Sequence, residues 1–172
     1  KLLLDRGIQF RGSKMSKMWG KPAVTVTTAG VDGQEGYTTL ALAAMAYFMG
    51  LNLKESAVFF SALPGEAMLD EAYRERAKYL GNILFDQNHH REKKKYICNV
   101  CFNDCFQYLG GNRIKCIVCR NVGSVSMSED AIGVDIIWGT GSFFMTHEDW
   151  QNHTKWLKEM KTKFLSNKEK LK

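Results

Sequence analysis

Two Cys-x-x-Cys pairs are the strongest chemical signal in this sequence. The first pair is Cys98 and Cys101, the second is Cys116 and Cys119, and fourteen residues lie between the pairs. Two such knuckles at this separation can bring four thiolates to the corners of a tetrahedron around one ion. The sequence therefore predicts a single metal ion bound by these four cysteines.

Zinc is the metal that we expect at this site, because a tetrahedron of four thiolates is its usual structural coordination. A rubredoxin-like iron site is the alternative, and it differs in function because iron there would carry electrons whereas zinc cannot. Phe102 and Arg120 stand directly after the second cysteine of each pair, where ribbon proteins usually have glycine. The fifth cysteine, Cys105, is expected to be a small buried hydrophobe, although it could substitute for a neighbouring ligand.

Composition indicates a reducing compartment for the chain. Four of the five cysteines fall in metal-ligand pairs, which favours metal binding over disulfides. The 172 residues are 45% hydrophobic, enough for one domain plus a small module, and they contain no run of eighteen apolar residues. Since a signal-peptide pattern is also absent, we expect a cytoplasmic protein without membrane attachment. Residues 1–6 read as the end of a helix that stops at Gly7, which suggests the later part of a longer chain.

A glycine-rich loop between a strand and a helix is the second candidate site. Residues 23–28 form a short β-branched run, residues 29–36 contain three glycines, and an apolar helix is expected over residues 37–50. The loop would lie at the carboxyl end of a parallel strand, where free amides and a helix N-terminus favour ligands. Its glycines match neither the dinucleotide fingerprint nor the Walker phosphate loop, so a ligand-binding loop and a plain tight turn both stay open.

Further elements must position this loop. Residues 56–61 form a second apolar run of strand length, and two strands joined by a helix make a βαβ unit with parallel strands. A helix with a core-facing stripe is predicted over residues 68–84. The helix at 37–49 is apolar nearly all round, so it needs a second cover besides its own sheet. We expect self-association into a homo-oligomer to supply that cover. The residues expected at the contact are Tyr47, Phe48 or Met49.

Polar residues separate this unit from the cysteine module. Residues 86–95 contain no apolar period and are predicted to link a domain over residues 1–85 to a small module over residues 96–172. His89 and His90 lie in this linker and are expected to be solvated, because they lack a second pair at metal-ligand spacing.

The small module is expected to be a zinc ribbon followed by a strand and a helix. Residues 110–112, Gly-Gly-Asn, suit a hairpin turn that returns the second knuckle to the first. A strand is predicted at 132–138, and Thr146 with Asp149 resembles a capping box that opens the last helix. An apolar stripe follows along that helix, in which His153 is interpreted as a core or interface residue. The stripe contains Trp150, His153, Leu157, Met160 and Phe164.

The basic residues concentrate at the C-terminus. Residues 151–172 hold seven lysines against two glutamates and so carry +5 of the net charge of +6. A solvated tail, frayed from Ser166 onward, is the default interpretation, and nucleic acid or an acidic partner is the alternative.

The first 85 residues resemble the carboxyl half of a flavodoxin-like NAD(P)H-dependent FMN reductase. The residues that carry the resemblance are the strand, the loop Thr-Thr-Ala-Gly-Val-Asp-Gly-Gln-Glu-Gly, the apolar helix, the second strand and Ala-Leu-Pro-Gly-Glu. The C-terminal ribbon is similar to the extension that some flavodoxin-family oxidoreductases carry. The resemblance implies an α/β fold: part of a flavodoxin-like parallel-sheet sandwich, then a small zinc-ribbon module and a C-terminal helix. It also implies that FMN would bind at the loop, beside Thr28, Ala29, Gly30, Gly33, Gln34 and Glu35.

Two classes of function are compatible with these residues. The resemblance implies an FMN-dependent oxidoreductase that takes hydride from NAD(P)H and passes electrons to an unidentified acceptor; no catalytic side chain is assigned. The family's serine-rich phosphate loop has no counterpart here, so the chain covers about half of such a domain and alone is expected to bind FMN poorly. The alternative is a non-catalytic binding module, in which the ribbon and the lysine-rich helix contact nucleic acid or protein.

Overall fold

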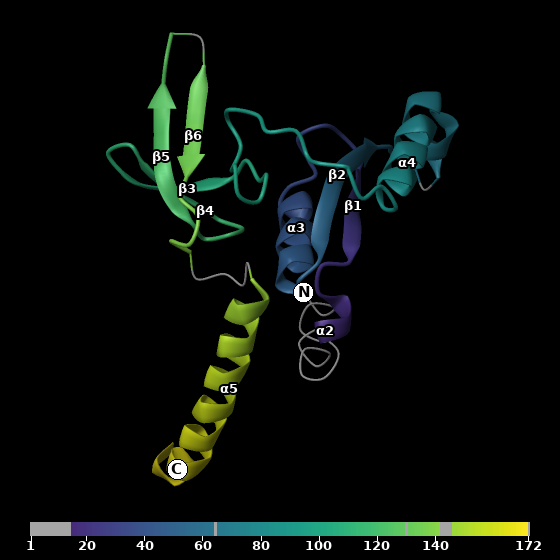
Figure 1. Cartoon of the computed structure of the whole chain (residues 1–172). Coiled ribbons are helices and arrows are strands. Elements are labelled where there is room, and N and C mark those ends of the chain that lie inside the picture. The colour runs from purple at the N-terminus through teal and green to yellow at the C-terminus, as the bar shows by residue number, and fades with distance from the viewer. Residues whose placement is uncertain (1–14, 64, 130, 142–145, 172) are drawn as a thin grey trace.

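A computed structural model describes residues 15–63, 65–129, 131–141 and 146–171 (Figure 1). It contains a two-stranded parallel sheet with helices, a four-stranded antiparallel sheet, and a long C-terminal helix that extends away from both (Figure 1). The helix expected over residues 1–6 lies outside the described residues. Within the described residues no helix is both long enough and apolar enough to cross a membrane.

The parallel sheet pairs β1 (Pro22–Ala29) with β2 (Asn52–Phe60), and α3 (Thr38–Phe48) connects them. This is the predicted βαβ unit, and the 29–37 loop leaves the carboxyl end of β1 as expected. β2 begins four residues before the predicted start at 56, because the polar segment Asn52–Glu55 continues the ladder and buries Leu53 and Lys54. The apolar run alone therefore underestimates the length of the strand.

A left-handed glycine turns the chain from α3 into β2. Gly50 has a φ of 69°, and its amide donates to the carbonyl of Tyr47 at 2.9 Å. A Cβ atom at Gly50 would lie 2.4 Å from the Trp19 ring, which follows the short helix α2 (Met15–Met18). Glycine is required here both by the backbone angle and by the close approach of the indole.

The helix predicted over residues 68–84 is divided in the structure. A 3-10 turn, η2 (Glu66–Leu69), precedes α4 (Glu71–Ile83). Asp70 between them is extended and its side chain accepts from the amide of Ala72 at 2.8 Å, so it acts as the N-cap. An aspartate that caps its own downstream helix ends the upstream turn, and this explains the break. The core beside β2 contains Phe59, Ala67, Leu80 and Ile83.

The antiparallel sheet has the order β3-β4-β5-β6; the first cysteine pair precedes β3, and the second pair begins at the last residue of β4. Gly110 and Gly111 have φ values of 97° and 61° and form the predicted turn between the first two strands. Gly123 is required in the third strand, because a Cβ atom there would lie 1.9 Å from the carbonyl oxygen of Asp135. The predicted strand at 132–138 ends at Ile136. The bounds are β3 (Phe106–Gly110), β4 (Arg113–Cys116), β5 (Val122–Met127) and β6 (Ile132–Ile136).

The C-terminal helix α5 (His147–Asn167) begins at the predicted capping box. Thr146 Oγ1 accepts from the amide of Asp149 and the Asp149 carboxylate accepts from the amide of Thr146, both at 3.0 Å. Trp150 is buried in its first turn, and the His147 ring lies 5.4 Å from the Trp19 ring. A 3-10 turn, η3 (Lys168–Leu171), continues it where a frayed tail was predicted.

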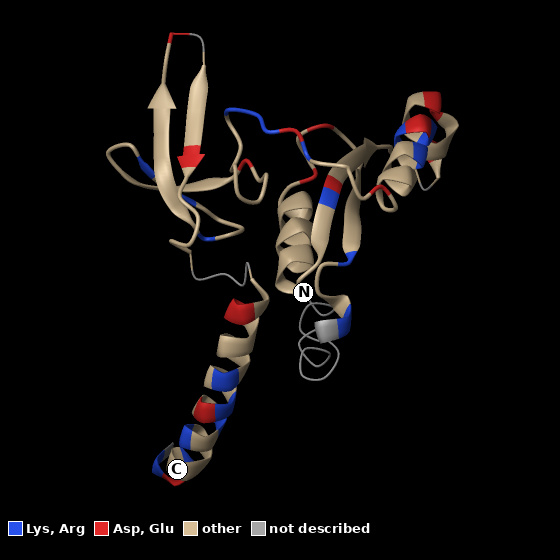
Figure 2. Cartoon of the chain, viewed as in Figure 1, with Lys and Arg blue, Asp and Glu red and all other residues tan. Residues whose placement is uncertain are grey.

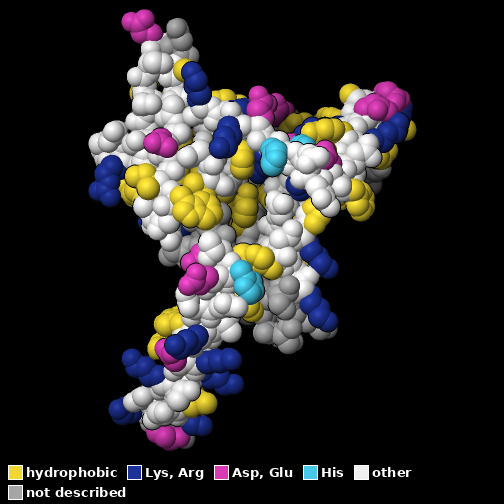
Figure 3. Space-filling view, viewed as in Figure 1, with side chains coloured by type: hydrophobic (Ala, Val, Ile, Leu, Met, Phe, Trp, Pro, Cys, Tyr) yellow, Lys and Arg dark blue, Asp and Glu magenta, His cyan; other side chains and the backbone are white. Residues whose placement is uncertain are grey.

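Beyond its first turn, α5 is largely exposed to solvent. Figure 2 shows its lysines and acidic residues spread along the helix, and Figure 3 shows apolar side chains between them. The exposed apolar side chains of this helix are Trp156, Leu157, Phe164 and Leu165. Most of the predicted stripe is therefore not core within this chain.

The fold is mixed α/β, as predicted, with one parallel and one antiparallel sheet. The parallel sheet has two strands within the described residues, and two parallel strands with one connecting helix are common to many α/β folds.

Candidate metal centre

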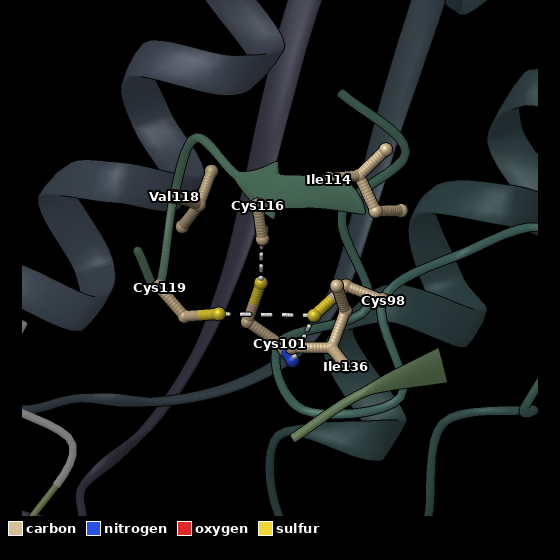
Figure 4. Packing of buried hydrophobic residues seen from close by; sticks show 7 residues of the cluster. All are labelled: Cys98, Cys101, Ile114, Cys116, Val118, Cys119 and Ile136. Atoms are coloured by element: carbon tan, nitrogen blue, oxygen red, sulfur yellow. Dashed lines mark hydrogen bonds between the residues drawn. The ribbon is translucent and has the colours of Figure 1, made fainter. Parts of the chain in front are cut away.

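The four predicted ligands come together in one buried cluster. The Sγ atoms of Cys98, Cys101, Cys116 and Cys119 all lie within 4.8 Å of one another, and each residue is at most 1% exposed. Figure 4 shows the side chains of the four cysteines grouped around a common centre. Cys101 Sγ lies 3.4 Å from Cys116 Sγ, and Cys98 Sγ lies 3.7 Å from Cys119 Sγ. This donor set could hold one metal ion such as zinc or iron.

The first knuckle is closed by backbone hydrogen bonds. The amide of Cys98 donates to the carbonyl of Asn103 at 2.8 Å, and the amide of Phe102 donates to the carbonyl of Cys98, also at 2.8 Å. Phe102 has a φ of 59°, a left-handed conformation that is uncommon outside glycine. The amide of Cys101 lies 3.5 Å from the Cys98 sulfur, as a donor to it. The turn thus directs both sulfur atoms to the same side.

The second knuckle repeats this geometry. The amide of Cys116 donates to the carbonyl of Asn121 at 2.9 Å, and the amide of Arg120 donates to the carbonyl of Cys116 at 3.0 Å. Arg120 has a φ of 65°. The two residues that replace the usual glycine therefore adopt the conformation that glycine would adopt, at a cost of about 1–2 kcal/mol each. The departure from the ribbon pattern changes the residue type and leaves the knuckle intact.

Contacts within the cluster shift the pKa values of the thiols in opposite directions. The contact with Cys116 is the largest cause that raises the pKa of Cys101, whereas donation from Cys101 lowers the pKa of Cys119. Metal ligation requires thiolates, and a cation at the centre would supply the charge that stabilises them.

Apolar residues from all four strands of the antiparallel sheet and from α3 surround the cysteines. Ile114, Val118 and Ile136 belong to the same buried cluster, so the cysteines are themselves the core of the ribbon. Leu40 and Ala44 of α3 pack against this cluster from outside. The metal centre therefore lies directly beside the βαβ unit.

The sequence predicts Tyr47 at a contact between copies of the chain, and the structure shows that it contacts the first knuckle within the chain. Its hydroxyl donates to the carbonyl of Cys101 at 2.9 Å, and burial raises the pKa of its phenol. The sequence correctly indicates that α3 needs a second cover, and the ribbon supplies part of it. Self-association through Tyr47, Phe48 or Met49 stays a prediction, although Met49 is buried within the chain.

Two asparagines brace the knuckles, and no motif in the sequence marks them. Asn99 accepts from the amide of Ile136 at 2.9 Å and donates to its carbonyl at 3.2 Å, which ties the first knuckle to β6. Asn121 is 1% exposed and accepts from the amide of Gly141 at 2.7 Å. Such outer contacts fix the orientation of the ligand-bearing loops.

Cys105 and the linker histidines lie outside the cluster of four cysteines. Cys105 is half-buried, its thiol contacts the Asp104 carboxylate at 3.4 Å, and burial followed by that carboxylate raises its pKa. It is less buried than predicted. His89, predicted to be solvated, is half-buried, whereas His90 is exposed. Neither histidine belongs to a group of metal-ligand side chains within the described residues.

The residues predicted to contact a flavin lie at the carboxyl end of β1. Thr28 and Ala29 pair with Phe59 and Phe60, and the loop then turns through Gly33, whose φ is 80°. A Cβ atom at Gly30 would meet no other atom within 4 Å. The remaining loop positions of the set are Gln34 and Glu35.

Two buried polar atoms lie close in sequence at this loop and were not predicted. Glu35 Oε2 and Thr39 Oγ1 are buried without a hydrogen-bond partner among the described residues. Orphaned acceptors and hydroxyls of this kind are rare in folded proteins and call for a partner.

Comparisons with protein-family models, with curated proteins and with solved structures found no match for this chain.

Proposed function

We propose that the four-cysteine cluster is a structural zinc site that folds the ribbon and fixes it against α3. The observation that carries the proposal is that four sulfur atoms lie within 4.8 Å of one another while their residues are at most 1% exposed. A catalytic zinc keeps one coordination position for water or substrate, whereas four buried thiolates leave none. The proposed role is therefore stability of the fold and not chemistry at the metal.

The proposed zinc would supply much of the folding free energy of the ribbon. The cysteines occupy the centre of its buried cluster, so few other side chains are available to form a core there. Structural zinc contributes apparent free energies of about 10–16 kcal/mol in small zinc modules. We therefore expect the metal-free ribbon to lose its tertiary structure.

Metal analysis of the purified chain, combined with its absorption spectrum, tests the proposal. One zinc per chain and no visible band support it, and a red thiolate-to-iron band would replace zinc by iron. Exchange of the bound metal for Co²⁺ should give the intense visible bands of a tetrahedral thiolate site. A chain that binds neither metal stoichiometrically would refute the proposal.

We propose, as a second function, that the chain forms part of an FMN-dependent NAD(P)H oxidoreductase with a flavodoxin-like fold. The observation in its favour is the loop at residues 29–36, which leaves the carboxyl end of a parallel strand and contains three exposed glycines. In open α/β sheets, ligands bind outside these strand ends. The bound flavin would supply hydride and electron transfer.

The chain's own residues suit the polar edge of such a ring. Glu35 Oε2 could accept from a ring N–H, and Thr39 Oγ1 could donate to a ring carbonyl, which would satisfy both orphaned atoms. Gly30 leaves space for a planar group against the backbone.

Replacement of Gly30 by Val tests this role with little risk to the fold, because its Cβ position is open and its φ is not in the left-handed region. We expect the substitution to weaken FMN binding at least tenfold in fluorescence titrations, in a form of the protein that also carries a phosphate-binding loop. Gly81→Val, at an open position on α4, is the matched control for bulk and is expected to leave flavin affinity unchanged. If neither the parent nor the control bound FMN, the oxidoreductase proposal would fall.

A non-catalytic binding module would then take its place. The exposed, lysine-rich α5 is the surface on which that alternative rests. Cytoplasmic localisation remains a prediction for either function.

A further inference from the structure

A basic cavity lies where the start of β2 meets the segment after α4. It has a volume of about 460 Å³, and its wall contains none of the four cysteines, although Phe102, the residue after Cys101, belongs to it. Three of its wall residues have basic side chains, namely Lys54, Arg91 and Lys93. His89 and His90 also line it, and no aspartate or glutamate belongs to its wall.

Lys54 is the most unusual member of this wall. It is 8% exposed, and lysine is almost never so buried without a paired carboxylate. Its Nζ atom donates to the carbonyls of Asp86 and His89, both at 3.3 Å, and it forms no ion pair within the described residues. Two carbonyl dipoles at that distance compensate a buried ammonium only in part.

The other side chains are held in place around the same space. The guanidinium carbon of Arg91 lies 5.0 Å from the centre of the Phe102 ring, and Phe102 also lines the cavity. This stacking orients the plane of the guanidinium, whose several N–H donors are suited to an oxyanion. His89 Nε2 is buried without a partner among the described residues, while its ring packs on Tyr79 at 6.1 Å.

The adjoining cavity provides an internal contrast. It shares His89, His90 and Arg91 with the basic cavity and has the same volume of about 460 Å³, but its wall includes three carboxylates. One of them, Glu55, lies 4.0 Å from the Arg76 guanidinium. Carboxylates are thus present next to the basic cavity and absent from its own wall. The carboxylates are Glu55, Glu92 and Asp104.

We propose that the basic cavity binds the phosphate group of a small organic phosphomonoester. Lys54, Arg91 and Lys93 would bind the dianion, and Phe102 and Leu53 would contact the organic part. The volume falls in the range of about 300–1,000 Å³ that is typical of small-molecule sites, larger than inorganic phosphate needs. An anion there would offset the charge of three basic side chains that form no ion pair within the described residues.

This site is independent of the proposed flavin loop. The cavity includes Asn52 and Lys54 at the start of β2, whereas the loop follows Ala29 at the end of β1. Asn52 pairs with Pro22 and Phe60 pairs with Ala29, so the two sites lie at opposite ends of the parallel pair.

Isothermal titration of the full chain with phenyl phosphate, inorganic phosphate and sulfate at low ionic strength tests the proposal. We expect phenyl phosphate to bind most tightly, because Phe102 adds contact with the aromatic ring. Lys54→Met should weaken its binding at least tenfold, and Lys93→Gln should weaken it about threefold. Absence of phenyl phosphate binding at millimolar concentration would overturn the proposal, and so would equal affinity for sulfate.

A neighbouring lysine provides the matched control. Lys95 is exposed and lines neither of the two cavities, so Lys95→Gln removes the same charge two residues away from Lys93. Its affinity should stay within twofold of the parent chain. If Lys95→Gln weakened binding as much as Lys93→Gln, the loss would reflect the net charge of the chain, and the proposed site would be wrong. Lys93 is exposed, so Lys93→Gln decides the question even if Lys54→Met does not fold.

Discussion

The hydroxyl of Tyr47 donates a hydrogen bond to the carbonyl oxygen of Cys101 across 2.9 Å. One atom of this pair belongs to α3 of the βαβ unit and the other to the first cysteine knuckle. Leu40 and Ala44 extend the same contact with apolar packing. The two parts of the chain therefore meet at the four-cysteine cluster, and a substitution in one part is expected to change the stability of the other.

Tyr47→Phe tests the strength of this junction. Removal of the hydroxyl leaves the carbonyl of Cys101 without this donor, which should lower the free energy of unfolding by about 1–2 kcal/mol. The bound metal should be retained, because no ligand changes. Urea unfolding and metal analysis provide the two measurements, and Tyr37→Phe, at a site 84% exposed, is the control. Loss of metal from Tyr47→Phe would show that the tyrosine acts on the knuckle and not only on the packing.

Alkaline pH should weaken the same junction. Burial raises the pKa of the Tyr47 phenol above the value of about 10 that it has in the unfolded chain. Its contribution is therefore fully present below pH 10 and decreases as the pH rises above that, because the unfolded state releases its proton first. Between pH 8 and pH 10.5 the parent chain should lose more stability than Tyr47→Phe. Equal losses in the two chains would contradict this assignment.

The four cysteines and Cys105 should respond differently to substitution. Cys98→Ser removes one of four thiolates and is expected to release the metal and unfold the ribbon. Cys105→Ser changes a half-buried thiol outside the cluster and should keep the full metal content. Metal stoichiometry and near-ultraviolet circular dichroism distinguish the outcomes. If Cys105→Ser released as much metal as Cys98→Ser, the set of ligands would be wrong.

Replacement of a left-handed knuckle residue by glycine should stabilise the fold. Arg120 is exposed and has a φ of 65°, so Arg120→Gly removes steric strain without loss of packing. Glycine also increases the entropy of the unfolded chain, which offsets part of the gain. We expect a net stabilisation of about 0.5–1 kcal/mol in urea unfolding. Arg113→Gly, at an exposed site within β4, should instead destabilise, and stabilisation by both changes would refute the argument.

Local pattern predicted the elements that depend on local chemistry. The spacing of the cysteine pairs, the Gly110–Gly111 turn and the capping box at Thr146 each correspond to the structure. Each of these motifs needs only a few neighbouring residues to fix its geometry, and this is why the sequence was sufficient.

Long-range packing could not be predicted in the same way. The apolar surface of α3 indicates that a cover is needed but does not say which segment provides it, and the ribbon contact at Tyr47 spans 54 residues. The side chains of Asn99 and Asn121 bind backbone groups that are distant in sequence, so the residue types alone do not indicate these contacts. The sequence gives no sign that Lys54 is buried. Its burial depends on the segment after α4, whose backbone carbonyls contact its Nζ atom.

Removal of α5 beyond Trp150 tests the binding-module alternative. Trp150 and His147 anchor the first turn, and most of the helix after them is exposed, so a chain that ends at Trp150 should keep its metal and its unfolding transition. The deletion removes +5 of the net charge of +6 and the exposed apolar side chains of the helix. The truncated chain should therefore elute from a heparin column at a much lower salt concentration than the parent chain.

A charge-only variant separates the two contributions of α5. Replacement of Lys155, Lys158, Lys161 and Lys163 by Gln keeps the apolar side chains and the helix length. If electrostatics dominates the interaction, this variant should elute with the truncated chain, since the number of phosphate or sulfate contacts sets the salt dependence. Elution of both variants with the parent chain would remove the support that α5 gives to a polyanion-binding function.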